Sequence, residues 1–382
     1  MDSKRCFTVE TLTDDLVVEI LCRVPFESFC RFKCVCKAWL AFSSDQHYRQ
    51  KLPKIPSLLL GCKYYIQRVS LSPNDEEIDG ALTFLPRREH IELVDCCNGL
   101  VLCKYTDAPP DICRFILCNP ATREWRMLPD THTDQYETWS GCKSILAFDP
   151  SWSAHFYVFN FQENRYKVWP FGFGKLEVFS SNLSTWVVDN DWRSMIEVEK
   201  PHIFIGGVLH VQTNGREILV LEGLEAMGSG IQPHGFTIKM PEDRYGLANG
   251  CFGQSSGFLL CAFPEEGGHR VAVWGLDSYR PCEWSRKHFL SLQNALGRDY
   301  FDRIGYWHML SCWRGYQILS LDLEREVLFL LDREAKKLLS YNISKGKLSE
   351  IHCSCPPWNT IFFRLPFWKC NYYVACYTKL PG

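Results

Sequence analysis

The chain has 382 residues, with 42 basic and 44 acidic side chains and a formal net charge of −2. Hydrophobic residues make up 46% and charged residues 23%, which excludes a mainly disordered or collagen-like chain and indicates a folded protein of one to three domains. Nucleic-acid binding is disfavoured, because such proteins usually carry a basic excess or a basic stripe.

No stretch of the sequence predicts a membrane segment. The longest apolar runs, such as Val327 to Leu331, are far shorter than the roughly 18 residues that cross a bilayer. Met1 to Glu10 contains a basic pair but no apolar run of the kind found in signal peptides. We therefore expect a soluble protein of the cytoplasm and/or nucleus, with no membrane partner.

The 20 cysteines predict buried thiols. They amount to about 5% of the chain, below the roughly 8–10% typical of a disulfide scaffold. No two of them have the C-x-x-C spacing of zinc and redox motifs. The sequence therefore predicts no metal and no cofactor.

Residues 11–52 have a helical pattern. Thr13 followed by Asp14 and Asp15 suits the start of a helix, where a capping oxygen and negative charge are favourable. Apolar residues then recur every four positions, at Leu12, Leu16, Ile20 and Val24. Pro25 ends this helix. A second apolar pattern follows, at Phe29, Phe32, Val35, Cys36, Trp39 and Leu40. Two or three short helices are predicted.

This helical segment is apolar over much of its surface, yet chains of about 40 residues rarely bury enough area to fold alone. It must therefore pack on the rest of the chain or on a partner. The proline-bearing exit at Leu52 to Pro56 favours a separable module. We expect 53–90 to hold a linker and the entry into a second domain, at 91–382.

After residue 56 the pattern changes to alternation with frequent turns. The clearest part is Ile203 to Leu221, where Gly206-Gly207 and Asn214-Gly215 separate three apolar runs. Asn-Gly between apolar runs is a strong hairpin signal, because both central residues of the turn need positive φ. The pattern predicts a three-stranded meander.

Five further hairpins are predicted, and few helical patterns interrupt them. In one of these hairpins, the turn is expected near Glu163-Asn164 and the second strand at Val168-Trp169. A weak helical pattern lies near Arg286 to Leu296. The hairpins span residues 115–125, 156–169, 176–186, 258–274 and 327–341.

One strand–turn–tryptophan element recurs, in 118–125, 179–186 and 274–284. At roughly 40–50 residues per four-stranded unit, the part after residue 56 would hold about six to eight units, the size of a β-propeller. Two stacked sandwiches are the alternative. The recurring Trp125, Trp186 and Trp284 favour packing between neighbouring sheets over a glycan-binding role.

No motif predicts catalysis. His90-Ile91-Glu92 resembles the start of a zinc-deaminase motif, but the downstream Pro-Cys-x-x-Cys is absent. The carboxylate pairs Glu76-Glu77 and Glu265-Glu266 lie among turn residues, where solvated loops are the better interpretation. We therefore predict no catalytic residue.

The stretch 12–39, LTDDLVVEILCRVPFESFCRFKCVCKAW, resembles an F-box, with Thr13 where the usual proline stands. The rest is similar to the F-box-associated, kelch-like β-domain of plant F-box proteins, through the motifs CCNGLVLC (96–103), CNPATREW (118–125) and FDP (148–150). The expected fold is thus α+β by domain: a small helical F-box at 11–52, then an all-β, propeller-like domain at 91–382.

The resemblance implies a non-catalytic substrate-recognition subunit of a cullin-RING (Skp-cullin-F-box type) E3 ubiquitin ligase. The F-box would dock a Skp-type adaptor, and the β-domain would bind an unknown target protein. The residues expected to contact the adaptor are Leu12, Leu16, Ile20, Leu21, Pro25, Phe29, Phe32, Val35 and Trp39.

Packing within the F-box is the alternative for Leu21, Val35 and Trp39. Two other functions stay open for the whole chain. One is a propeller lectin or enzyme with no ligase role, and the other is an F-box scaffold or decoy that assembles no ligase.

Overall fold

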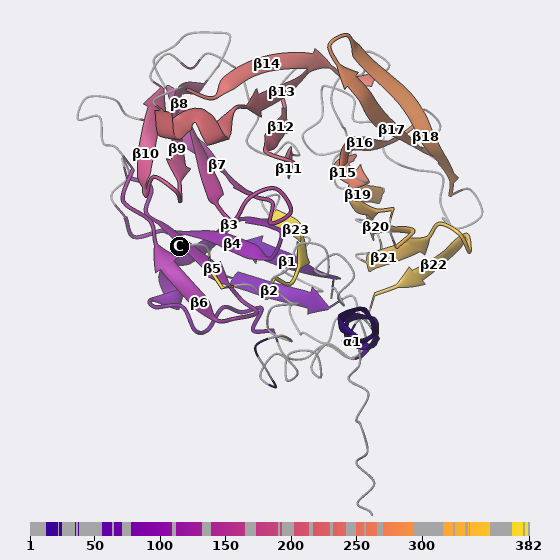
Figure 1. Ribbon diagram of the computed structural model, residues 1–382. Helices are drawn as coiled ribbons and strands as arrows, with labels where there is room; N and C mark the ends of the chain where they lie inside the picture. Colours follow the sequence, from indigo (N-terminus) through magenta and orange to yellow (C-terminus); the bar gives the residue numbers. More distant parts are fainter. Residues whose placement is uncertain are drawn as a thin grey trace, which may run out of the picture.

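The computed structural model describes most of the chain after residue 56 and a small part before it (Figure 1). The described residues are 13–21, 23–24, 35, 37, 56–62, 65–70, 78–108, 112–131, 139–164, 173–189, 192, 202–213, 217–229, 232–241, 250–255, 257–265, 270–292, 316–323, 325–332, 335, 337–351, 369–376 and 379–380.

Within 11–52, the described helix is α1 (Asp14–Leu21). It begins directly after Thr13, whose carbonyl oxygen accepts a hydrogen bond from Val17 N at 3.0 Å. Asp14 and Asp15 occupy the first turn, where the helix dipole favours negative charge. The expected start is therefore confirmed, and the other helices predicted for this segment lie outside the described residues.

The described strands form six sheets, five of them four-stranded. Blade 1 contains β3 (Ile91–Cys97), β4 (Leu100–Tyr105), β5 (Phe115–Asn119) and β6 (Glu124–Met127). Blade 2 contains β7 (Trp139–Phe148), β8 (Phe156–Asn164), β9 (Phe173–Ser180) and β10 (Thr185–Asp189). Blade 3 contains β11 (His202–Ile205), β12 (Val208–Gln212), β13 (Glu217–Glu222) and β14 (His234–Lys239).

The remaining sheets complete a ring. Blade 4 contains β15 (Cys251–Ser255), β16 (Phe258–Pro264), β17 (Arg270–Tyr279) and β18 (Cys282–Ser291). Blade 5 contains β19 (Tyr316–Asp322), β20 (Val327–Asp332), β21 (Lys337–Asn342) and β22 (Lys347–Glu350). The closing sheet has the order β2-β1-β23, from β1 (Pro56–Cys62), β2 (Tyr65–Ser70) and β23 (Lys369–Val374).

The ring closes because the two ends of the β-domain share a sheet. β1 pairs antiparallel with β23, with Pro56 opposite Val374 and Gly61 opposite Lys369. Each inner strand contacts the next around the centre, in the order β3, β7, β11, β15, β19, β23 (Figure 1). The fold is a six-bladed β-propeller, and this confirms the expected fold class.

The described residues include two short 3₁₀ helices, η1 (Arg88–His90) before β3 and η2 (Leu224–Ser229) between β13 and β14. The segment 53–90, expected to hold a linker and the entry to the β-domain, contains β1 and β2 of the closing sheet. The described sheets therefore begin at Pro56.

The meander predicted at 203–221 is confirmed as β11, β12 and β13. Four of the five other hairpins are also confirmed, by the pairs β5–β6, β9–β10, β16–β17 and β20–β21.

The turn predicted near Glu163-Asn164 is wrong, because β8 continues through Asn164. The expected return through Val168-Trp169 lies outside the described residues. The weak helical pattern near Arg286 belongs instead to β18, whose pairing with β17 extends to Ser291. Strand pairing there overrides the local periodicity.

Apolar residues are buried mainly between neighbouring sheets. Five clusters of buried side chains each join two neighbours: the closing sheet with blade 1, blade 1 with 2, 2 with 3, 3 with 4, and 4 with 5. Among the described residues, these five pairs of neighbouring sheets each share a core.

Candidate functional site

The first candidate surface is one side of α1. Leu16 and Ile20 are 52% and 47% exposed, and a spacing of four residues puts them on one face of the helix. Val17, Val18 and Leu21 are buried on the other side. Two large aliphatic side chains are therefore solvent-exposed next to each other. This arrangement is expected of a helix that docks a partner.

The nine expected adaptor contacts divide into three groups. Leu16, Ile20 and Val35 are exposed. Leu21 is 1% exposed, which favours the packing alternative for that residue. The others lie outside the described residues: Leu12, Pro25, Phe29, Phe32 and Trp39.

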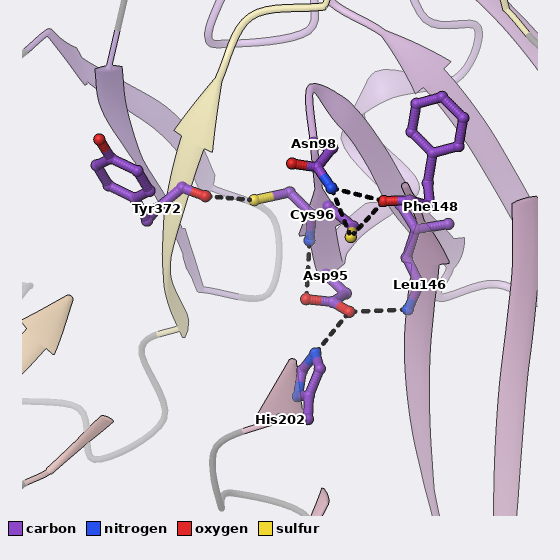
Figure 2. Close-up of polar contacts among 8 residues, drawn as sticks. Asp95, Cys96, Asn98, Leu146, Phe148, His202 and Tyr372 are labelled. Atoms are coloured by element: carbon purple, nitrogen blue, oxygen red, sulfur yellow. Dashed lines mark hydrogen bonds and ion pairs between the residues drawn. The ribbon is translucent and has the colours of Figure 1, made fainter. Parts of the chain in front are cut away.

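A second candidate site lies among the inner strands, around the buried carboxylate of Asp95 on β3 (Figure 2). Asp95 Oδ2 accepts a hydrogen bond from Leu146 N of β7 at 2.8 Å and lies 2.9 Å from His202 Nε2 of β11. Asp95 Oδ1 accepts from Cys96 N at 2.8 Å. One carboxylate therefore connects the inner strands of three successive blades.

The family-like motif at 96–103 forms a second connection next to it. Asn98 and Gly99 have φ of 44° and 86° and make the tight turn between β3 and β4. Asn98 Nδ2 donates to Phe148 O at 2.7 Å, and the Cys97 thiol donates to the same oxygen at 3.1 Å (Figure 2). The motif thus fastens blade 1 to the end of β7 in blade 2.

The other two motifs make equivalent connections. Asn119 Nδ2 donates to Cys376 O at 2.8 Å, which holds the segment after β23 against blade 1. Asp149 Oδ2 accepts from Gly206 N at 2.9 Å, which joins blade 2 to the β11–β12 turn. All three motifs thus join neighbouring parts of the ring.

Two of the recurring tryptophans also join blades. Trp186 on β10 donates its indole N–H to Pro129 O at 2.8 Å, and Trp284 on β18 donates to Lys239 O at 2.9 Å. Each acceptor lies at or just after the outer strand of the preceding blade. Trp125 occupies the same strand position but is 43% exposed, so the expectation that it packs between sheets is wrong.

The chemistry available around the inner strands is limited. Burial raises the pKa of the Cys97 thiol to about 12, so it stays protonated at neutral pH and is a poor nucleophile or metal ligand. Among the described residues, no group of three or more His, Cys, Asp or Glu side chains is placed to hold a metal ion. The hydrogen bonds of Asp95 to β7 and β11 make this cluster a joint between three blades.

A buried histidine joins blades 3 and 4. His210 on β12 is stacked on Tyr279 of β17, with ring centroids 5.8 Å apart and Nε2 2.6 Å from the Tyr279 hydroxyl. Burial lowers the pKa of His210 to about 4, against a smaller opposite effect of the Ile203 backbone. His210 is therefore neutral at physiological pH.

This burial predicts a pH-dependent stability. As the pH falls, the unfolded chain protonates this histidine near pH 6.5, whereas the folded chain does so only near pH 4. The free energy of unfolding is therefore highest above about pH 6.5 and decreases toward pH 4. The expected loss is about 3 kcal/mol. Urea unfolding at several pH values measures how the free energy of unfolding falls with pH. The wild type and the exposed control His234→Asn should show this fall, and His210→Asn should show a smaller one. An unchanged slope in His210→Asn would contradict the assignment.

None of the described helices is long and apolar enough to cross a membrane.

Comparison with known families identifies an F-box domain in the first part of the chain. Residues 10–51 match the F-box domain. A putative F-box/kelch-repeat protein of Arabidopsis thaliana is 28% identical over 46% of this chain and 46% of its own length. An F-box protein of the same plant is 26% identical over 53% of this chain and 58% of its own. A putative F-box protein is 24% identical over 73% and 72% of the two chains.

Among solved structures, a protein from Lactobacillus plantarum is 12% identical, with a TM-score of 0.44 over 78% of this chain and 82% of its own. The β-propeller domain of Cps50 (Swd1) from Myceliophteria thermophila is 11% identical, with a TM-score of 0.34 over 67% and 81%.

The molecule is thus an N-terminal F-box domain joined to a six-bladed β-propeller. It is similar to plant F-box and F-box/kelch-repeat proteins, and the chain spans about half the length of the first two of these relatives.

Proposed function

We propose that the protein is the substrate-recognition subunit of a cullin-RING ubiquitin ligase of the Skp-cullin-F-box type. Its F-box docks a Skp-type adaptor, and its propeller holds a target protein. The observation that carries the proposal is the pair Leu16 and Ile20, which are about half exposed on a helix inside the F-box match.

The energy available from this surface supports docking. Complete burial of a leucine or isoleucine is worth about 1.5–3 kcal/mol, so covering the exposed half of each gains about 1 kcal/mol. Together the two side chains provide about 2 kcal/mol, or more than a tenfold factor in affinity. Val35 and the expected contacts outside the described residues would add to this.

The propeller supplies a rigid platform and no bond chemistry in this proposal. Hydrogen bonds at Asp95, Asn98, Asn119 and Asp149 join neighbouring blades of this platform. A bound target would then present a lysine to the ubiquitin carrier at a raised effective concentration. The protein contributes proximity.

The proposal is tested by two assays on the full chain. Co-purification with a Skp-type adaptor separates an F-box function from a propeller lectin or enzyme with no ligase role. Transfer of ubiquitin to captured proteins in a reconstituted ligase separates a substrate receptor from a scaffold or decoy. We expect adaptor binding and ubiquitin transfer. Absence of adaptor binding would overturn the proposal, and binding without transfer would favour the scaffold.

A further inference from the structure

A cavity of about 270 Å³ lies between blade 2 and the η2 segment of blade 3. Its lining residues come from the β7–β8 turn, the start of β8, the β9–β10 turn and η2, and they include Trp152, His155, Tyr157, Asn182, Leu224 and Glu225. The volume falls just below the range of about 300–1,000 Å³ typical of drug-sized ligands. The cavity therefore suits a single side chain of a larger partner.

The wall formed by Trp152 is held in place before any ligand binds. Gly207 has φ of +87°, and a Cβ there would lie 2.5 Å from Cε2 of Trp152, so the indole packs directly on the β11–β12 turn. Trp152 also makes an edge contact with Phe204, with centroids 5.7 Å apart. On the blade 2 side, Phe156 N donates to the Ser181 hydroxyl at 3.0 Å. The cavity is thus preorganised.

Two polar groups at the cavity have no partner among the residues that the structure describes. Tyr157 is only 4% exposed, and its hydroxyl makes no hydrogen bond there. Glu225 is exposed and makes no ion pair with a described residue. Burial and then the charge of Glu225 raise the pKa of Tyr157. The hydroxyl thus feels a negative charge, and the cavity favours a cation.

We propose that this cavity binds an arginine side chain of the target protein. The guanidinium would stack on the indole of Trp152 and donate to the Glu225 carboxylate and the Tyr157 hydroxyl. A planar group with several N–H donors uses an aromatic face and a carboxylate together, whereas a lysine ammonium is a strongly hydrated point charge. This inference deepens the proposed function. That the arginine belongs to a target protein rests on the proposed function.

The experiment uses the full chain in complex with the adaptor, or alone if no complex forms. Nα-acetyl-arginine amide and its neutral isostere Nα-acetyl-citrulline amide are titrated at millimolar concentration and followed by ligand-observed NMR. We expect binding of the arginine probe and at least tenfold weaker binding of the citrulline probe. Glu225→Gln and Tyr157→Phe should each weaken arginine binding at least threefold. The control Glu217→Gln, an exposed glutamate of β13, should leave it unchanged.

Equal binding of the two probes, loss of arginine binding in the Glu217→Gln control, or no arginine binding would overturn the inference. So would tighter binding of Nα-acetyl-aspartate amide. The result also separates this inference from the proposed function. Adaptor binding without arginine binding removes the inference alone, whereas arginine binding without adaptor binding removes the ligase role and leaves the cavity as an arginine site.

Discussion

Replacing Gly99 by alanine should destabilise the propeller by about 2–5 kcal/mol. Gly99 has φ of +86°, and an alanine in such a conformation costs roughly 1–2 kcal/mol. The added Cβ would also overlap the backbone N and the Cβ of Cys376 and lie 2.8 Å from its Cα. Forcing atoms into a packed site costs about 1–3 kcal/mol more, because here backbone has to move.

Gly257→Ala is the matched control for this prediction. Its φ is +80°, but a Cβ there meets nothing within 4 Å. It should cost only the conformational part, about 1–2 kcal/mol. Chemical denaturation gives the free energy of unfolding of each variant. The extra loss in Gly99→Ala over Gly257→Ala measures the cost of disturbing the contact between the β3–β4 turn and the segment after β23. Equal losses in the two variants would show that this contact contributes little to ring closure.

Replacing Leu16 and Ile20 together by serine should weaken adaptor binding at least tenfold. Both side chains are about half exposed on α1, so the change removes apolar surface available to a partner. The stability of the free chain should change little, because the buried side of α1, with Val17, Val18 and Leu21, is kept. Titration calorimetry with a Skp-type adaptor measures the affinity.

Phe258→Ser is the control for this pair. Phe258 is 59% exposed on β16 of blade 4, so the variant removes an apolar side chain from another domain. Its adaptor affinity should equal that of the wild type. An unchanged affinity in Leu16→Ser/Ile20→Ser, or an equal loss in Phe258→Ser, would argue against docking on this face of α1.

Local signals predicted much of the β-domain. Gly206-Gly207 marked the β11–β12 turn correctly, and both glycines have positive φ there. Asn214-Gly215 lie outside the described residues, but β12 and β13 pair on either side of them as predicted. The recurring tryptophans lie on the outer strands of blades 1, 2 and 4. The alternation of apolar and polar residues did not predict the full length of the longer strands. β8 runs through the polar Glu163-Asn164, and β18 through a pattern that resembles a helix.

Contacts distant in sequence could not be predicted. The β1–β23 pairing joins the two ends of the β-domain, and nothing in either strand alone specifies the other. The same holds for the Asp95 joint, where β3, β7 and β11 meet. The only local sign of this joint is an aspartate within an otherwise apolar stretch. The cavity lined by Trp152, Tyr157 and Glu225 was also missed, because it forms only when two blades pack together.

The exposure of α1 was partly predictable. A period of four residues identified the helix, but it could not separate the exposed Leu16 and Ile20 from the buried Leu21. That separation depends on which side of α1 packs on the chain, and packing of that kind is a tertiary property.

Amide hydrogen exchange of the full chain, with and without a Skp-type adaptor, tests the central claim most directly. If the F-box docks the adaptor while the propeller stays free for a target, the adaptor should slow exchange in and around α1 and leave the six sheets unchanged. Unchanged exchange at 14–21 under saturating adaptor, or protection confined to the propeller, would contradict the account.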